Sequence, residues 1–266
     1  MTTHFRLEFA ALSDIGLIRS VNEDAIAIRP EYGLAILADG MGGHNAGEVA
    51  SHMAVEVIQQ SLTARMQHAV ADSISDFSDY LPAWVGDAIE LANTYIHEAS
   101  HYEPDCSGMG TTIVVALHYR GRLTVAHVGD SRAYRLRQQR LEQLTRDHSW
   151  LQEQIDAGLI SPEMARISSN KNLITRALGI APYVEVEVHE YASQAGDIIL
   201  LCSDGVNDML SDQAMCGVLS RCGQALQAAC KKLIQLANDS GGRDNASVIL
   251  IKVQDDDGQA GLLHQL

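Results

Sequence analysis

The order of helical and extended apolar patterns is the feature that most restricts the fold of this chain. A short buried strand at 34–38 is followed by helices at 48–62 and 82–99, which apolar residues at helical spacing predict. Shorter apolar runs separated by polar turns then predict strands at 111–117, 123–128 and 133–136. We expect these three consecutive strands to form one antiparallel meander.

The second half of the chain also alternates helical and extended patterns. Residues 149–157 look helical, and Ser161 before Pro162 is typical of an N-cap followed by proline at the first helical position. Alternation at 184–189 predicts a half-exposed strand, and the unbroken apolar run at 198–202 predicts a central one. The remaining expected elements are helices at 211–220 and 224–237 and a strand at 247–253.

Pairs of helices that alternate with runs of antiparallel strands favour stacked sheets covered by helices over a doubly wound parallel sheet. The expected fold class is therefore α+β. The sequence has no internal repeat and no linker-like segment, so we expect a single domain over residues 1–266 with a short tail at about 254–266. With 46% hydrophobic residues, the chain has enough apolar material for a sizeable core.

The charge of the chain excludes one class of partner. A formal net charge of −15 opposes binding to a phosphate backbone, so no nucleic-acid partner is expected. The five cysteines form no C-x-x-C pair and are odd in number, which favours reduced thiols. We find no leader-like or membrane-spanning apolar segment, and we therefore expect a cytoplasmic protein with no membrane partner.

Aspartates recur where apolar runs end. Asp39 follows the run at 36–38, Asp130 and Asp204 follow two others, and Asp244 precedes the last expected strand. A single aspartate beside glycine usually marks only a turn, but four such positions together predict a metal site. Oxygen ligands without histidine or cysteine at ligand spacing favour Mg²⁺ or Mn²⁺, and the spacing of a calcium-binding EF-hand is absent.

Eight short motifs, in this order, resemble the metal-dependent protein phosphatases of type 2C, and above all their compact bacterial members. The resemblance extends from about Leu12 to Val253. The motifs are RSVNED at 19–24, ADGMGGH at 38–44 with GEVAS at 47–51, GTT at 110–112, GDSRAY at 129–134, DHS at 147–149, RALG at 176–179, SDG at 203–205 and GRDN at 242–245.

The resemblance implies a central β-sandwich of two antiparallel sheets flanked by pairs of helices, with two Mn²⁺ or Mg²⁺ ions in a cleft at one end. It implies that Asp39 bridges the two ions and that the Gly40 carbonyl joins the first. Asp204 and Asp244 would complete the second. A hydroxide shared by the ions would attack phosphorus directly.

Further roles follow from the same resemblance. Glu23 would reach the first ion through water, and Asp130, together with Asp204, would hold a third, weaker ion. Arg19 would grip the substrate phosphate through its bidentate fork without touching a metal. Many animal members have a histidine where this chain has Met41, which cannot donate a proton, so the general acid is a metal-bound water or absent.

The implied activity is hydrolysis of phosphoserine and phosphothreonine on proteins, opposing a cognate serine/threonine kinase in a bacterium, by a monomeric enzyme. A flap at about 147–176 would lie beside the cleft, with Lys171 available to meet an acidic or phosphorylated substrate. Two alternatives stay open: a metal-dependent phosphatase of small phosphoesters, and an inactive module that binds phosphoproteins. Carboxylate chemistry itself does not distinguish the first alternative.

Overall fold

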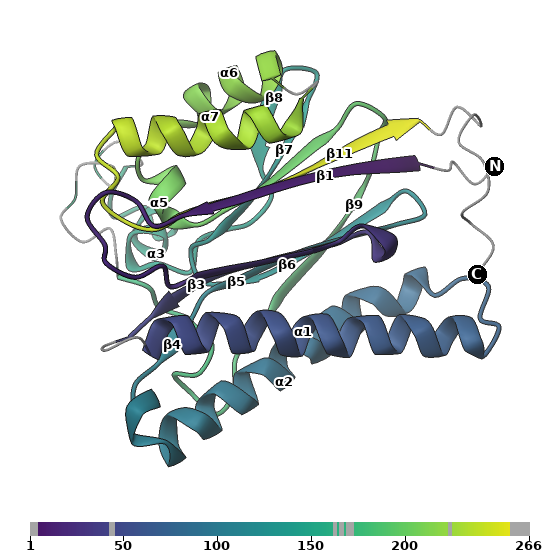
Figure 1. Ribbon diagram of the computed structural model, residues 1–266, viewed down its shortest axis with the longest axis horizontal. Coiled ribbons are helices and arrows are strands. Elements are labelled where there is room, and N and C mark those ends of the chain that lie inside the picture. The colour runs from purple at the N-terminus through teal and green to yellow at the C-terminus, as the bar shows by residue number, and fades with distance from the viewer. Residues whose placement is uncertain are drawn as a thin grey trace.

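Two antiparallel sheets lie face to face, and helices cover both outer surfaces (Figure 1). The computed structural model describes residues 5–42, 46–161, 164, 168, 173–222 and 225–255. Within this part of the chain, the α+β sandwich expected from the sequence is confirmed.

The first sheet has the strand order β1-β11-β10-β7-β8, so the two ends of the described chain pair with each other. Strands β1 and β11 run antiparallel over ten residues each, from Phe5 opposite Asp255 to Asp14 opposite Ala246. The strands of this sheet are β1 (Phe5–Asp14), β7 (Arg132–Arg137), β8 (Arg140–Gln143), β10 (Ile198–Cys202) and β11 (Ala246–Asp255).

The second sheet has the order β2-β3-β5-β6-β9, with the short strand β4 paired to the end of β3. Asp24 on β2 lies directly opposite Asp39 on β3, which brings two acidic residues together at one end of this sheet. The strands are β2 (Asp24–Arg29), β3 (Leu34–Met41), β4 (Gly110–Thr111), β5 (Ile113–Tyr119), β6 (Arg122–Val128) and β9 (Glu187–Ala192).

Each sheet carries its own pair of helices on the outside (Figure 1). Helices α1 (Ala46–Ala71) and α2 (Leu81–Tyr102) pack on the second sheet, and α6 (Asp212–Cys222) and α7 (Leu226–Asp239) pack on the first. The short elements are α3 (Trp150–Asp156), α5 (Asp204–Asn207) and the 3-10 turns Pro30–Tyr32, Ser78–Tyr80 and Pro104–Cys106. No helix among the described residues is long and apolar enough to cross a bilayer.

Strand β10 shows why the sequence of a central strand is an unbroken apolar run. Successive side chains of a strand point to opposite faces. Leu200 therefore packs under the helices α6 and α7, while Ile199 and Leu201 pack between the two sheets against residues such as Leu37 and Val114. Because both faces are buried, no polar residue is tolerated until Ser203, and the aspartate that follows is held at a rigid strand end.

One sequence expectation about the strands is wrong. Strands β5 and β6 pair as predicted, but β7 pairs with β10 in the opposite sheet, so the three strands do not form a single meander. The chain crosses between sheets at Gly129, whose φ of +107° lies in a region that side chains rarely adopt. The crossing places Asp130 between the two layers.

Other expectations are met in part. The alternating segment at 184–189 enters a strand only at Glu187, because Val184 and Val186 pack against the core under α2 before pairing with β6 begins. Strands β1, β2 and β8 were not predicted. Ser161 acts as expected of an N-cap, since its Oγ accepts a hydrogen bond from the N–H of Met164 at 3.3 Å. Lys171, and tail residues 256–266, lie outside the described residues.

Leu201 offers a test of the core between the sheets. It is fully buried three residues before Asp204. We expect Leu201→Ala to lower the free energy of unfolding by about 2 to 5 kcal/mol, through lost apolar burial and the cavity left behind. Urea denaturation measures this directly. Leu91→Ala, at a position that is 39% exposed on α2, is the control and should change stability by about 0.5 kcal/mol or less; equal losses for both variants would contradict the assignment.

Candidate metal centre

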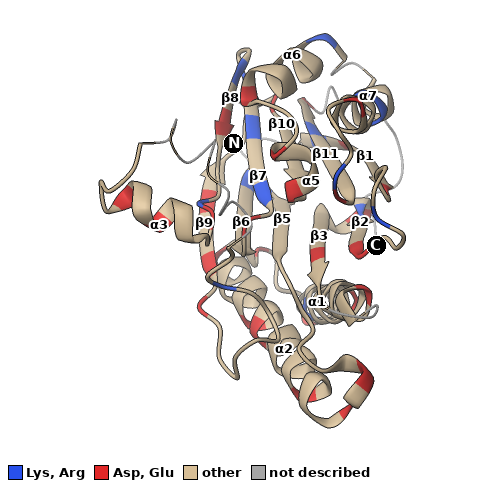
Figure 2. Ribbon diagram, turned by 90° about the vertical axis from the view of Figure 1, so that its left-hand side faces the viewer, with Lys and Arg blue, Asp and Glu red and all other residues tan. Residues whose placement is uncertain are grey.

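Four aspartates converge at one end of the sandwich, between the layers. Asp39 lies near the end of β3, Asp204 begins α5 directly after β10, Asp244 precedes β11, and Asp130 occupies the crossing from β6 to β7. Figure 2 shows acidic positions of β3 and α5 at this end of the two layers. The structure thus brings the four aspartates to one end of the sandwich, where they repel one another.

Burial and mutual repulsion raise the pKa values of carboxylates in this group. Burial, followed by repulsion from Asp24, Asp204 and Asp130, raises the pKa of Asp39 well above its ordinary value. Burial and repulsion from Asp130 and Asp244 raise the pKa of Asp204 in the same way. The pKa of Asp130 rises to about 7, mainly because of burial and then because of Asp147.

Hydrogen bonds fix the backbone of Asp39. Its N–H donates to the Thr112 Oγ1 at 3.1 Å, and its carbonyl accepts from the Thr112 N–H and from the Thr111 hydroxyl, both at 2.9 Å. The Thr112 hydroxyl also lies 2.7 Å from the hydroxyl of Ser131, the residue after Asp130. Thr111 and Thr112 therefore fix the position of the Asp39 backbone relative to the segment that carries Asp130.

Gly40 is required by a close approach of backbone to backbone. A Cβ atom at this position would overlap the carbonyl of Gly47, near the start of α1, and would come within 2.6 Å of the Glu23 carbonyl oxygen. The Gly40 N–H donates to that same Glu23 carbonyl at 3.1 Å. The start of α1, the end of β3 and the Glu23 segment can meet only because no side chain stands between them.

Asn245 anchors the loop that carries Glu23. Its Oδ1 accepts from the Glu23 N–H at 2.8 Å, and its Nδ2 donates to the carbonyls of Ile15 and Val21, each at 3.0 Å. Burial is the main cause of a raised pKa at Glu23, and the charge of Arg19 opposes it. The residue beside Asp244 therefore also sets the position of the Glu23 loop.

Arg19 contacts Asp244, a proposed metal ligand, and the sequence did not predict this contact. Its Nη2 donates to Asp244 Oδ2 at 2.7 Å, with side chains that are 47% and 28% exposed. Arg19 extends from the loop before β2 toward the acidic group, where the pairing with Asp244 raises the pKa of the guanidinium. A guanidinium has five N–H donors, so a bond to one carboxylate leaves others for an anion.

Asp24 is the residue that sequence reasoning missed. It lies in the 19–24 motif, but no role was assigned to it. It is 5% exposed and its Oδ2 accepts from the Ser203 hydroxyl at 2.8 Å, while its Oδ1 is buried without a hydrogen-bond partner among the described residues. Burial raises its pKa to about 6. An acidic residue at the first position of an otherwise apolar strand was the available signal.

These features fit a site for hard divalent cations. The donors are carboxylate and carbonyl oxygens, which Mg²⁺ and Mn²⁺ prefer. The carboxylates repel one another, and the unpartnered oxygen of Asp24 lies opposite Asp39. Cations placed among Asp39, Asp204 and Asp244 would remove this repulsion, which burial otherwise makes costly.

The chain is similar in sequence and fold to known protein phosphatases. The family model described as protein phosphatase 2C matches residues 19–245. The serine/threonine phosphatase stp of Listeria monocytogenes is 37% identical over 243 residues, covering 90% of this chain and 93% of that protein. Among crystal structures, the serine/threonine phosphatase PstP/Ppp of Mycobacterium tuberculosis is 36% identical, covers 93% of this chain and 99% of its own, and has a TM-score of 0.83.

A second structure bears on the metal. The catalytic domain of the phosphatase PstP in complex with two manganese ions is 37% identical, covers 95% of this chain and all of its own, and has a TM-score of 0.81.

The pKa of Asp24 yields a test in the presence of a chelator. A carboxyl whose folded pKa is raised destabilises the fold once pH exceeds the unfolded value, and fully so above the folded value of about 6. We expect Asp24→Asn to raise the free energy of unfolding by about 2 to 3 kcal/mol at pH 8, and by less at pH 5. Urea denaturation at the two pH values measures both. A variant less stable than wild type at pH 8 would show that the Asp24 charge is already compensated.

Proposed function

Because the chain belongs to the protein phosphatase 2C family, we propose that its aspartate cluster is the catalytic centre of a metal-dependent serine/threonine protein phosphatase. The chain hydrolyses phosphoserine and phosphothreonine monoesters on proteins and uses two Mn²⁺ or Mg²⁺ ions. The observation that carries the site assignment is the convergence of Asp39, Asp204 and Asp244 from three strand ends, with burial and mutual repulsion raising the pKa of Asp39 and Asp204.

We propose that Asp39 bridges the two ions, with the Gly40 carbonyl on the first ion and Asp204 and Asp244 on the second. When bound, the ions supply an activated water and offset negative charge on the phosphoryl group. The contribution of the chain is to hold these oxygens in place before substrate arrives. The bonds from Thr111 and Thr112 to Asp39 support this role, because they leave its backbone no freedom to adjust.

Glu23 and Asp130 take supporting positions in this proposal. Glu23 acts on the first ion through water, and Asp130 with Asp204 holds a third, weaker ion. The pKa of Asp130, about 7, and that of Asp204 are both raised, and each aspartate contributes charge at this edge of the cluster. Asp24, which is paired with Asp39 across the sheet, adds a further buried carboxyl that repels Asp39.

Arg19 is proposed to bind the substrate phosphate. Its bond to Asp244 places the guanidinium beside the cluster, so a phosphate bound there would meet a positive charge that is already oriented. Met41, which follows Gly40 on β3, has no proton to donate. The leaving alkoxide therefore takes its proton from water, and no side chain of this chain is assigned as general acid.

Phosphorylated proteins are the substrates, and a cognate serine/threonine kinase in a bacterium is the proposed source of their phosphate. We also propose one catalytic domain over residues 1–266 with a flap at about 147–176, acting as a monomer in the cytoplasm. The pairing of β1 with β11 supports the single domain, and five unpaired cysteines support a reducing compartment. A small-molecule phosphatase and an inactive binding module are not favoured.

The decisive experiment is phosphate release from a phosphothreonine peptide with and without added Mn²⁺. Release that depends on the metal and resists thiol-blocking reagents supports the proposal, because no cysteine is assigned to the site. Full activity after exhaustive chelation would contradict it. Cleavage of p-nitrophenyl phosphate without cleavage of phosphopeptides would favour a small substrate instead.

Asp39→Asn tests the bridging role. Loss of a charge shared by two ions should reduce kcat to below about a tenth of the wild-type value, which is a barrier increase of more than about 1.4 kcal/mol. The fold should persist, since the substitution removes repulsion rather than apolar packing. Steady-state kinetics in saturating Mn²⁺ and thermal unfolding measure the two effects. Asp72→Asn, an exposed position after α1, is the control, and a tenth or more of the activity remaining in Asp39→Asn would contradict the bridging role.

Arg19→Ala separates phosphate binding from metal binding. A charge-assisted contact at a half-exposed side chain should contribute about a 10- to 50-fold factor in kcat/KM, mostly through KM. Mn²⁺ affinity should be unchanged or slightly tighter, because Asp244 loses a competing cation. Phosphopeptide kinetics and a separate Mn²⁺ titration measure the two quantities. Arg6→Ala on β1 is the control, and weaker Mn²⁺ binding in Arg19→Ala would mean that Arg19 instead orients Asp244 for the ion.

A further inference from the structure

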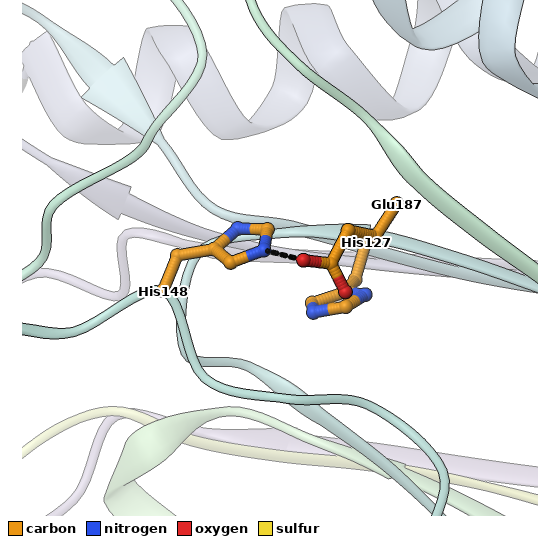
Figure 3. Close-up of side chains that lie close together, drawn as sticks. All are labelled: His127, His148 and Glu187. Carbon is orange, nitrogen blue, oxygen red and sulfur yellow. Dashed lines mark hydrogen bonds and ion pairs between the residues drawn. The ribbon is translucent and has the colours of Figure 1, made fainter. Parts of the chain in front are cut away.

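A second group of titratable side chains lies outside the aspartate cluster, near the start of the flap (Figure 3). His127 on β6 and Glu187 on β9 are directly paired across the sheet, and His148 follows β8. The His127 and His148 rings are stacked, with centroids 4.6 Å apart and an angle of 19° between planes. Glu187 Oε1 lies 3.1 Å from His148 Nε2.

The three residues offer atoms within 4.8 Å of one another that could in principle bind a metal, but their hydrogen bonds point elsewhere. His148 Nδ1 accepts from the Gly129 N–H at 3.1 Å, so the proton of the neutral ring is on Nε2, which donates to Glu187. A protonated Nε2 has no lone pair for a metal. Burial lowers the pKa of His148, in agreement with a neutral ring.

The neighbouring groups also oppose a cation at this place. His127 Nε2 lies 2.7 Å from the Arg146 carbonyl and must donate to it, so the buried Nδ1 of His127 is the one ring nitrogen of the two histidines whose lone pair is unused. The Arg176 guanidinium stands 3.9 Å from Glu187 Oε1 and already provides a positive charge. The group is therefore a hydrogen-bonded network centred on His148, in which His127 Nδ1 has no partner among the described residues.

The position of His148 in the chain gives this network a consequence. Its N–H donates to the Gly129 carbonyl at 2.9 Å while its ring accepts from the Gly129 N–H, so the two residues are joined by two hydrogen bonds. Gly129 directly precedes Asp130 at the crossing between the sheets. A buried imidazole thus fixes the backbone on one side of Asp130, and the Thr112–Ser131 contact fixes the other side.

The same residue also meets the far end of the flap. The His148 carbonyl accepts from the Thr175 N–H at 2.9 Å, and Ser149 pairs with Ile174 in an isolated bridge. Arg176, the next residue, contacts both Glu187 and the Glu185 carbonyl. The two ends of the flap therefore lie side by side, where His148 and Arg176 both contact Glu187.

We propose that His148 is a positioning residue for the phosphatase reaction, which fixes the Gly129–Asp130 crossing through Nδ1 and the base of the flap through Nε2 and Glu187. One imidazole then sets both the position of Asp130 and the position of the segment beside the substrate. This inference rests on the proposed function in one respect, the assignment of a third metal ion to Asp130.

Two substitutions separate the two bonds. In His148→Asn, the amide oxygen stands near the place of Nδ1 and keeps the acceptor for Gly129, but the donor to Glu187 is lost. In His148→Gln, the amide stands near the place of Nε2 and keeps the donor to Glu187, but the acceptor for Gly129 is lost. A role in core packing alone would be disturbed by both variants in the same way.

The first measurement is amide hydrogen exchange at Gly129 by NMR, on the full chain in Mg²⁺. We expect exchange to accelerate by about tenfold or more in His148→Gln and to stay within about twofold of wild type in His148→Asn. Kinetics supply the second measurement. His148→Gln should raise the metal concentration for half-maximal activity by about five- to tenfold, the effect of one lost hydrogen bond.

His148→Asn should leave that metal dependence unchanged and raise KM for a phosphopeptide by about five- to tenfold. The KM for p-nitrophenyl phosphate should not change, because a small substrate has little contact with the flap. Glu187→Gln should resemble His148→Asn, since it weakens the charge contact with Arg176 but not the bond to Gly129. Glu190→Gln is the matched control on the same strand, where the carboxylate is exposed and pairs with Arg122.

Equal changes in both His148 variants, or none in either, would overturn the proposal. If neither variant folds, Glu187→Gln decides, and wild-type behaviour there would overturn the flap part of the proposal. Thermal stabilisation by Zn²⁺ that is present in wild type and lost in His148→Asn would overturn it in favour of a metal site. If wild type shows no metal-dependent phosphatase activity, the proposed function fails, while the exchange of the Gly129 amide still tests the role of His148.

Discussion

The repulsion among buried carboxylates is the constraint on which the rest of this structure depends. Asp24, Asp39, Asp130 and Asp204 all have raised pKa values, in each case with burial as the largest cause. Such a group is unfavourable unless cations accompany it. The sandwich supplies the rigidity that holds these side chains together, because each stands at the end of a strand whose apolar residues are packed on both faces or under helices. The folded state is therefore less stable at this end of the sandwich, where the carboxylates form a site that divalent ions would complete.

Much of the fold could be predicted from the sequence, because buried elements have regular apolar patterns. Strand β10 coincides with its predicted range, and all four long helices were found, although α1 extends nine residues beyond the predicted end at residue 62, to Ala71. The strands that were missed, β1, β2 and β8, all lie at sheet edges, where the side chains are largely only partly buried. The placement of β7 could not be predicted either, since a strand pattern does not say which sheet the strand joins.

The candidate site shows a similar division. The four aspartates were recognisable because each follows or precedes an apolar run, and the convergence of such runs is a property of the sandwich. The network of Asp24 was not recognisable, because its bond to Ser203 joins residues 179 positions apart. The pairing of Arg19 with Asp244 spans 225 positions and depends on how the first loop returns to the last strand, which Asn245 fixes through its bonds to Ile15 and Val21. Long-range polar contacts of this kind have no local signature.

The contacts around Arg19 and Asp244 also relate substrate binding to metal binding. Arg19 forms an ion pair with Asp244 and so partly offsets the charge of that carboxylate. An arriving phosphate would draw the guanidinium away from Asp244, and the carboxylate would then interact more strongly with an ion. Substrate and metal would therefore favour each other's binding through a shared partner, and by linkage the effect must be equal in both directions. Arg19 lies at the exposed rim, while the carboxylates that are fixed by Thr111, Thr112 and Ser203 lie deeper. This division would let the outer part of the site respond to substrate without disturbing the inner part that is proposed to hold the ions.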